Sequence, residues 1–256
     1  MSKILKVKAR QVFDSRGNPT VEAEVYTKNN SSNAICPSGA STGTYEAFEK
    51  RDKNNKRYLG KSVLSAVNLV NTKISNKLKG QSVHNQERID TLLINLDGTR
   101  QKTNLGANAM LAVSMAVKKL SAKVKKLPLY KTFFIKKNFQ LPYPLMNIIN
   151  GGAHANNGLR IQEFMIRPDR AKSFADAMRI CFIVIKNLSK LIKNKGLSTS
   201  VGDEGGFAPM ISSNNQALDL IVKAIKKSGF VNGKDVSICL DVAANELYKK
   251  NKYSIH

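Results

Sequence analysis

The chain has 256 residues, of which 42% are hydrophobic and 23% are charged, and these proportions are ordinary for a soluble globular protein. Its 42 Lys and Arg against 18 Asp and Glu give a formal net charge of +24, which favours anionic partners such as nucleic acid, an acidic membrane or a phosphorylated metabolite. The lysines are scattered over every segment, and Trp is absent. Nucleic-acid binders instead gather basic residues and interleave exposed aromatic ones. We therefore attribute the excess of lysine to compositional drift of the genome rather than to selection for nucleic-acid binding. We expect no specific nucleic-acid partner.

Targeting signals are also missing from the pattern. The first ten residues are broken by lysines and lack the apolar core of a signal peptide, and the apolar stretch 180–185 is far too short to span a membrane. Cys36, Cys181 and Cys239 are odd in number and widely spaced, which favours buried free thiols in a reducing compartment. We expect a cytoplasmic protein with no membrane span.

The first half of the chain predicts a small antiparallel sheet followed by helices. Residues 3–36 indicate strands, because Val21, Ala23 and Val25 alternate with polar neighbours in the period-two pattern of a half-buried strand. A helix is expected from about Ser62 to Gly80, the latter a candidate C-cap, and further helical patterns follow near 84–96 and 105–124. This order is typical of an α+β domain, which we assign to residues 1–135.

Beyond a Lys- and Pro-containing seam at 125–143 the pattern changes, and we assign residues 136–256 to a second domain. Short apolar runs at 146–149 and 161–166 precede a long helix and a second helix at 214–228. The run 236–242 predicts a near-continuously buried strand, so the alternation favours a parallel α/β arrangement. The expected apolar face of the long helix consists of Phe174, Met178, Cys181, Ile185, Leu188 and Ile192.

Candidate site residues follow the ends of these runs. His154 lies in the glycine-rich segment 150–158, and Glu163 lies in a strand whose period of two separates it from Gln162 and Phe164. Glu204 occupies the glycine-flanked segment 201–206, and Asp241 ends the last strand. We expect the three carboxylates to meet at one end of neighbouring strands, where they could share a proton or hold a divalent metal. Each taken alone is equally well interpreted as an acid on an exposed loop.

The segment 37–43, PSGASTG, lacks the spacing and the lysine of a Walker loop. Its hydroxyls and backbone amides are of a kind that approaches a phosphate or metal, although a mobile surface loop would have the same composition.

Together these motifs closely resemble the enolase family, and they run through almost the whole chain in the family's order. The residues that carry the resemblance are DSRGNPTVEAEV (14–25), SGASTG (38–43), LDGT (96–99), GANAMLAVSMA (106–116), LPLY (127–130), MNIINGGAHA (146–155), IQEFMI (161–166) and VGDEGG (201–206). The resemblance implies an α+β N-terminal domain followed by an α/β barrel of the TIM type that begins ββαα before its βα repeats. It also implies magnesium-dependent, reversible dehydration of 2-phosphoglycerate to phosphoenolpyruvate in glycolysis, and a homodimer for the full-length family.

Roles for individual residues follow from the same resemblance. It implies that Glu204 is the proton donor and that Glu163 lies beside it and raises its pKa by like-charge repulsion. His154 and Gln162, together with Glu163, match substrate-contacting positions. Asp241 matches a ligand of the first magnesium ion, and Ser41 matches a loop residue that binds the second.

The chain also departs from the family pattern. The family continues beyond His256, where the resemblance puts the lysine base, two further acidic metal ligands and an Arg-Ser pair with a second lysine for the substrate. About three barrel strands are expected here, so we expect a truncated product that is inactive by itself. Arg160 and Lys50 stand where acidic or neutral residues are common in the family. The alternative is a non-catalytic enolase remnant that acts as a basic binding or interaction protein.

Overall fold

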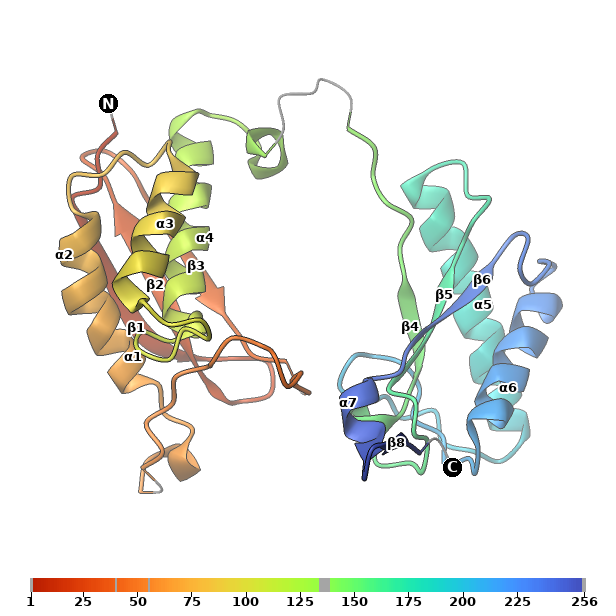
Figure 1. The fold of residues 1–256 in the computed structure, drawn as a ribbon. Helices are drawn as coiled ribbons and strands as arrows, with labels where there is room; N and C mark the ends of the chain where they lie inside the picture. Colours follow the sequence, from red (N-terminus) through yellow and green to blue (C-terminus); the bar gives the residue numbers. More distant parts are fainter. Residues whose placement is uncertain (1, 40, 55, 134–138, 255–256) are drawn as a thin grey trace. The chain divides into compact units, whose positions relative to one another are not determined.

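The computed structural model describes residues 2–39, 41–54, 56–133 and 139–254 (Figure 1). The chain divides into two compact units, Met1–Lys137 and Asn138–His256. The domain boundary expected between residues 135 and 136 lies outside the described residues.

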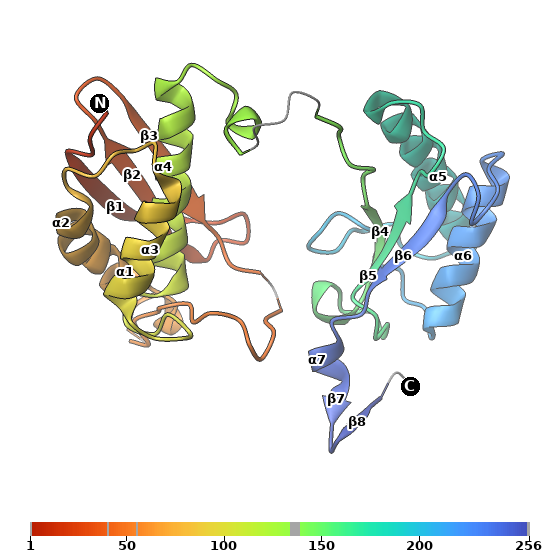
Figure 2. The same cartoon turned by 45° about the horizontal axis from the view of Figure 1, so that its top comes forward.

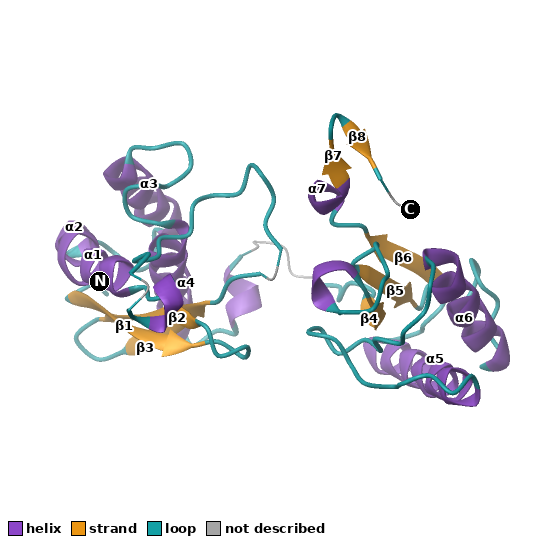
Figure 3. Ribbon diagram, turned by 90° about the horizontal axis from the view of Figure 1, so that it is seen from below, coloured by secondary structure: helices purple, strands orange, loops and turns teal. Residues whose placement is uncertain are grey.

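The first unit contains a three-stranded antiparallel sheet in the order β1-β2-β3, with its helices on one face (Figure 3). The expected inward face of the central strand is confirmed, because Val21, Ala23 and Val25 have no exposed surface. Glu22 is buried as well, since it lies between two strands and accepts a hydrogen bond from Asn33 at 2.6 Å besides pairing with Arg10. The strands are β1 (Lys6–Phe13), β2 (Pro19–Tyr26) and β3 (Ser31–Cys36).

Four α-helices follow in this unit, and α4 packs on β2 and β3. The expected helix ending at Gly80 is interrupted by a π-helical turn, Val70–Ile74, which keeps Ala66, Val70, Ile74 and Leu78 buried on one face. The helices are α1 (Leu64–Leu69), α2 (Ser75–Leu78), α3 (Gln86–Asp97) and α4 (Ala107–Val124), with short 3-10 turns at Tyr58–Gly60 and Leu129–Thr132.

The second unit has the element order ββααβ, as the resemblance implies for the start of the barrel. Its strands lie side by side in the order β4-β5-β6, and β5 is antiparallel to both neighbours (Figure 2). The parallel arrangement expected from the strand and helix alternation is therefore wrong for both of these pairs. The elements are β4 (Met146–Asn150), a 3-10 turn (Gly152–His154), β5 (Glu163–Arg167), α5 (Phe174–Asn194), α6 (Asn214–Lys227), β6 (Ser237–Asp241), α7 (Ala244–Leu247), β7 (Tyr248–Lys249) and β8 (Lys252–Tyr253).

Helices α5 and α6 cover one face of this sheet and form a single apolar core with it (Figure 3). The burial of Cys181, Leu188 and Ile192 is confirmed, but Phe174 and Met178 are 45% and 41% exposed. Ala177, Ile180 and Val184 are buried instead, so the buried stripe is rotated from the expected one.

Strand β6 is half exposed rather than continuously buried. Val236 has no exposed surface, but Leu240 is 42% exposed and Asp241 is exposed. The reason is its place at the edge of the sheet, since within the described residues β5 is its only partner strand. These three strands do not close a barrel.

The cysteines are free thiols, of which Cys181 is buried and the other two are partly buried. Burial raises the pKa of the Cys181 thiol to about 11. Among the described residues no helix is both long enough and apolar enough to cross a membrane.

Candidate active site

The connection from β4 to β5 positions two of the candidate residues. After β4, Gly151 donates its N–H to the carbonyl oxygen of Gln162 at 2.9 Å, and a single 3-10 turn then brings in His154, whose side chain is only 3% exposed. Gly151 is required here, because an added Cβ would lie 2.5 Å from the Cβ of Leu159. Glu163 begins β5, with its side chain 14% exposed. The expected alternation along this strand is confirmed, since Phe164 is fully buried and Glu163 is not.

Glu204 comes from the long connection between α5 and α6 rather than from the end of a strand. Phe207 forms a parallel bridge with Ile149 on β4, and Gly202 donates to the carbonyl oxygen of Gly206 at 2.9 Å, which closes a tight turn. The N–H of Asp203 donates to the carbonyl oxygen of His154 at 3.1 Å. The turn is thus fixed to the segment that carries His154, and Glu204 extends from it with its side chain 51% exposed.

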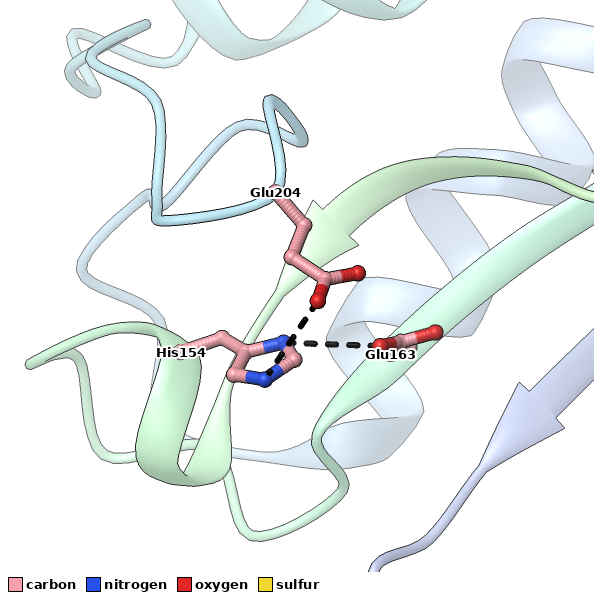
Figure 4. A group of neighbouring side chains, drawn as sticks. All are labelled: His154, Glu163 and Glu204. Atoms are coloured by element: carbon pink, nitrogen blue, oxygen red, sulfur yellow. Dashed lines mark ion pairs between the residues drawn. The ribbon is translucent and has the colours of Figure 1, made fainter. Parts of the chain in front are cut away.

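His154, Glu163 and Glu204 form one cluster (Figure 4). The Nδ1 atom of His154 lies 3.4 Å from Oε1 of Glu163, and its Nε2 atom lies 3.8 Å from Oε1 of Glu204. One ligand-type atom from each of the three residues lies within 4.8 Å of the other two. Two carboxylates thus face opposite nitrogens of one buried imidazole.

Electrostatics in the cluster is asymmetric. Burial, a hydrogen bond with Glu204 and the negative charges of Glu204 and Asp241 together raise the pKa of Glu163 to about 7. The Glu163 carboxyl group is therefore partly protonated near neutral pH, which relieves the repulsion that two full negative charges would exert on each other. The resemblance implied a raised pKa for Glu204, which stays a prediction; in the structure the raised pKa belongs to Glu163.

The other expected site residues lie at different places relative to this cluster or outside its unit. Asp241 is the register partner of Glu163 across β5 and β6, and its Oδ1 accepts the N–H of Ala243 at 3.0 Å. It reaches the same sheet end as Glu163 because Glu163 begins an antiparallel strand, whereas parallel carboxyl ends were expected. Gln162 is 3% exposed, and its Oε1 atom has no hydrogen-bond partner within the described residues. Ser41 is a half-buried residue of the first unit, and its metal role stays a prediction.

Residues 4–133 match the enolase N-terminal domain, and residues 138–256 match the enolase C-terminal TIM barrel domain. The chain belongs to the enolase family. It is 82% identical to the enolase of Pelagibacter ubique (strain HTCC1062) over 256 residues, which is the whole of this chain and 61% of that relative. It is also 51% identical to the enolase of Bdellovibrio bacteriovorus over 254 residues, or 99% of this chain and 60% of that relative. The chain thus spans about three fifths of the length of these two enolases.

One residue of this enolase-type site had no role in the sequence interpretation. Asn150, the last residue of β4, has no exposed surface, and it lies against both Gly202 and Gly206. The only sequence signal was its position before two glycines in the segment 150–152, which does not reveal that a second glycine-rich segment folds against it.

The raised pKa of Glu163 leads to a pH-dependent contribution to stability. Because its folded pKa of about 7 lies above its ordinary value of 4.5, the folded chain binds more protons between these values. The contribution of Glu163 to the free energy of unfolding is therefore fully present below pH 4.5 and is lost as the pH rises through 7. We expect a carbon-13 carboxyl titration of Glu163 with a midpoint near 7, and a flatter stability profile in Glu163→Gln. A midpoint near 4.5 would contradict the geometry of the cluster.

Proposed function

We propose that this chain carries the proton-donor part of a magnesium-dependent enolase site, which interconverts 2-phosphoglycerate and phosphoenolpyruvate. The observation that carries the proposal is the convergence of Glu204 and Glu163 on His154, where the pKa of Glu163 is raised to about 7. Loss of a hydroxide from carbon requires a positioned acid, and a carboxyl group held protonated near pH 7 is suited to that task.

The roles proposed for the residues follow their surroundings. Glu204 is the more exposed carboxyl group and would donate the proton to the departing hydroxide. Glu163 is the more buried one, and its raised pKa would limit the like-charge repulsion between it and Glu204. His154 and the orphaned Oε1 of Gln162 would contact the substrate. The Asp203 amide, bonded to the carbonyl oxygen of His154, would hold the donor's turn in place.

Magnesium fits the donor chemistry at the end of β6. Asp241 is an exposed carboxylate with one oxygen hydrogen-bonded to Ala243, and a hard dication prefers oxygen ligands. Asp241 would supply one ligand of the first ion and Ser41 a hydroxyl ligand of the second. When bound, the metal would add positive charge that stabilises the enediolate formed from the substrate, as is generally established for enolase-superfamily sites.

Activity in a completed chain tests this proposal. A chimera that joins residues 1–256 to the remaining part of the Pelagibacter enolase should form phosphoenolpyruvate from 2-phosphoglycerate only when magnesium is present. Absorbance of the product follows the reaction, and the parent Pelagibacter enolase is the control. A folded chimera without turnover would overturn the proposal.

For the whole protein we further propose a homodimer that is located in the cytoplasm. Its ligand would be a small phosphorylated metabolite.

The net charge of +24 supports a second candidate, in which the chain binds anionic partners without catalysis. Exposed lysines are dispersed over helix faces, for example Lys73 on the π-helical turn, Lys77 on α2, and Lys223 and Lys226 on α6. Such a surface should bind nucleic acid weakly and through counterion release alone. We expect binding to a duplex or single strand to be lost between low salt and about 0.15 M salt, as measured by fluorescence anisotropy. Sequence-selective binding that persists at that salt would favour the second candidate.

A further inference from the structure

Asn150 occupies the junction of the three segments that build the site. Its backbone N–H donates to the carbonyl oxygen of Phe207 at 2.9 Å, and its carbonyl oxygen accepts a hydrogen bond from the side chain of Asn157 at 2.9 Å. Its side chain points neither to solvent nor into the apolar core; it lies against the turn that carries Glu204.

Two glycines of that turn lie close to this side chain. A Cβ added to Gly206 would collide with Oδ1 of Asn150, and one added to Gly202 would lie 2.5 Å from the carbonyl oxygen of His154 and 2.6 Å from Nδ2 of Asn150. Neither glycine has a positive φ, so close approach rather than backbone conformation requires glycine at both positions. Gly205 is different, because its φ of 80° favours glycine and an added Cβ would meet nothing within 4 Å.

The chemistry of the side chain is a second observation. Both polar atoms of Asn150 are buried, and neither has a hydrogen-bond partner within the described residues. A buried amide without partners destabilises a fold, so an aliphatic side chain would serve better if the position only filled space. The amide of Asn150 therefore has a role besides filling space: it contacts the turn beside it, either directly or through a water molecule between the side chain and the turn.

We propose that Asn150 is a positioning residue, whose side chain sets the place of the turn 202–206 and thereby the distance of Glu204 from His154 and Glu163. The turn is held from two sides, by the Asn150 side chain and by the bond from the Asp203 amide to the carbonyl oxygen of His154. Asn150 ends β4, and His154 lies in the connection from β4 to β5. Both holding groups therefore belong to the segment that also carries His154 and leads to Glu163, so they fix Glu204 relative to these two residues. The inference rests on the role proposed above for Glu204.

A double-mutant cycle in the 256-residue chain tests the contact. Gly206→Ala should lower the melting temperature by about 5 °C or more, because the new methyl group meets Oδ1 of Asn150. In an Asn150→Ala background the same change should cost much less, since the nearest remaining atoms are the backbone N of Ile149 at 3.0 Å and the backbone C of Ile148 at 3.1 Å. Asn187→Ala is the matched control: Asn187 bonds Ser228 between α5 and α6, so its effect should add to that of Gly206→Ala. Additive effects for Asn150 as well would overturn the proposal.

Hydrogen exchange and kinetics measure the position of the turn 202–206 separately from the stability of the chain. Asn150→Ala should speed hydrogen exchange of the Asp203 and Gly202 amides at least about tenfold, whereas Asn187→Ala should not. In the chimera, Asn150→Ala and the near-isosteric Asn150→Leu should both lower kcat with little change in KM, because a misplaced acid weakens only the transition state. Unchanged amide exchange, or unchanged kcat in a chimera whose kcat depends on Glu204, would overturn the proposal. If Glu204→Gln leaves kcat intact while the cycle still shows coupling, the error lies in the proposed function instead.

Discussion

Glu204→Gln is expected to lower kcat of the chimera by at least about two orders of magnitude, the usual contribution of a positioned general acid. Glutamine keeps the size and hydrogen-bonding shape of the side chain but has no acidic proton to give to the leaving hydroxide. The loss should fall on kcat with KM nearly unchanged, because the proton moves only in the transition state. Initial rates over a range of 2-phosphoglycerate concentrations separate the two constants.

The control is Asp219→Asn, which neutralises an exposed acid on α6 that is not part of the site. It should leave both constants within about twofold of the parent, since an isolated exposed charge interacts weakly through water. A Glu204→Gln chimera with kcat within about threefold of the parent would show that the donor is another group. Glu163, whose pKa is already near 7, would then be the next candidate to examine in the same way.

Most of the fold could be predicted from the sequence, because the periodic spacing of apolar residues is strong. The inward alternation of β2 and the helical pattern expected from Ser62 to Gly80 both appear in the structure, since each buries a continuous apolar face. Strand direction was misjudged because periodicity reports which side chains are buried and does not report the direction in which neighbouring strands run.

The burial of β6 was overestimated for a related reason. An apolar run predicts a strand with two neighbours, yet whether the second neighbour exists depends on residues elsewhere in the chain. On α5, Phe174 and Met178 satisfy a helical spacing, but the adjacent stripe that contains Ala177 and Val184 is the buried one. The two stripes overlap on the helix surface, and an apolar pattern does not report which of them faces the core.

The sequence predicted the identity of the main site residues but not how they are arranged. The sequence motifs indicated His154, Glu163 and Glu204 through their glycine-rich or apolar surroundings, and the structure brings these three together. The raised pKa of Glu163 was not foreseen, because it depends on burial, on the neighbouring Glu204 and on Asp241 facing it from the next strand. Asn150 was missed because its contact with Gly202 and Gly206 joins segments about fifty residues apart, a separation that no local pattern reports.

The largest contrast is expected between the 256-residue chain by itself and the same chain with its complement. Alone, the chain should give no detectable phosphoenolpyruvate. Removing a proton next to the substrate carboxylate creates a dianion that needs concentrated positive charge, whereas the described cluster consists of carboxyl groups around one imidazole. Asp241 supplies a single carboxylate, and magnesium prefers a near-octahedral set of oxygen ligands. The chain spans 61% of the Pelagibacter enolase, and we expect the remaining part to supply further cationic groups and metal ligands.

The open edge of β6 adds a physical consequence that is measurable without substrate. Its backbone groups on one side have no strand partner within the described residues, so the lone chain should self-associate as its concentration rises. Light scattering of the chain, with and without the separately made remaining part of the Pelagibacter enolase, measures this tendency.

This remaining part, the complement, should suppress association and restore turnover together, because the same added strands would cover the edge and complete the site. Adding the complement to a Glu204→Gln chain is the matched control, and it should suppress association without restoring turnover. Turnover by the lone chain would contradict the prediction, as would a complement that suppresses association of the unmodified chain yet leaves it without activity.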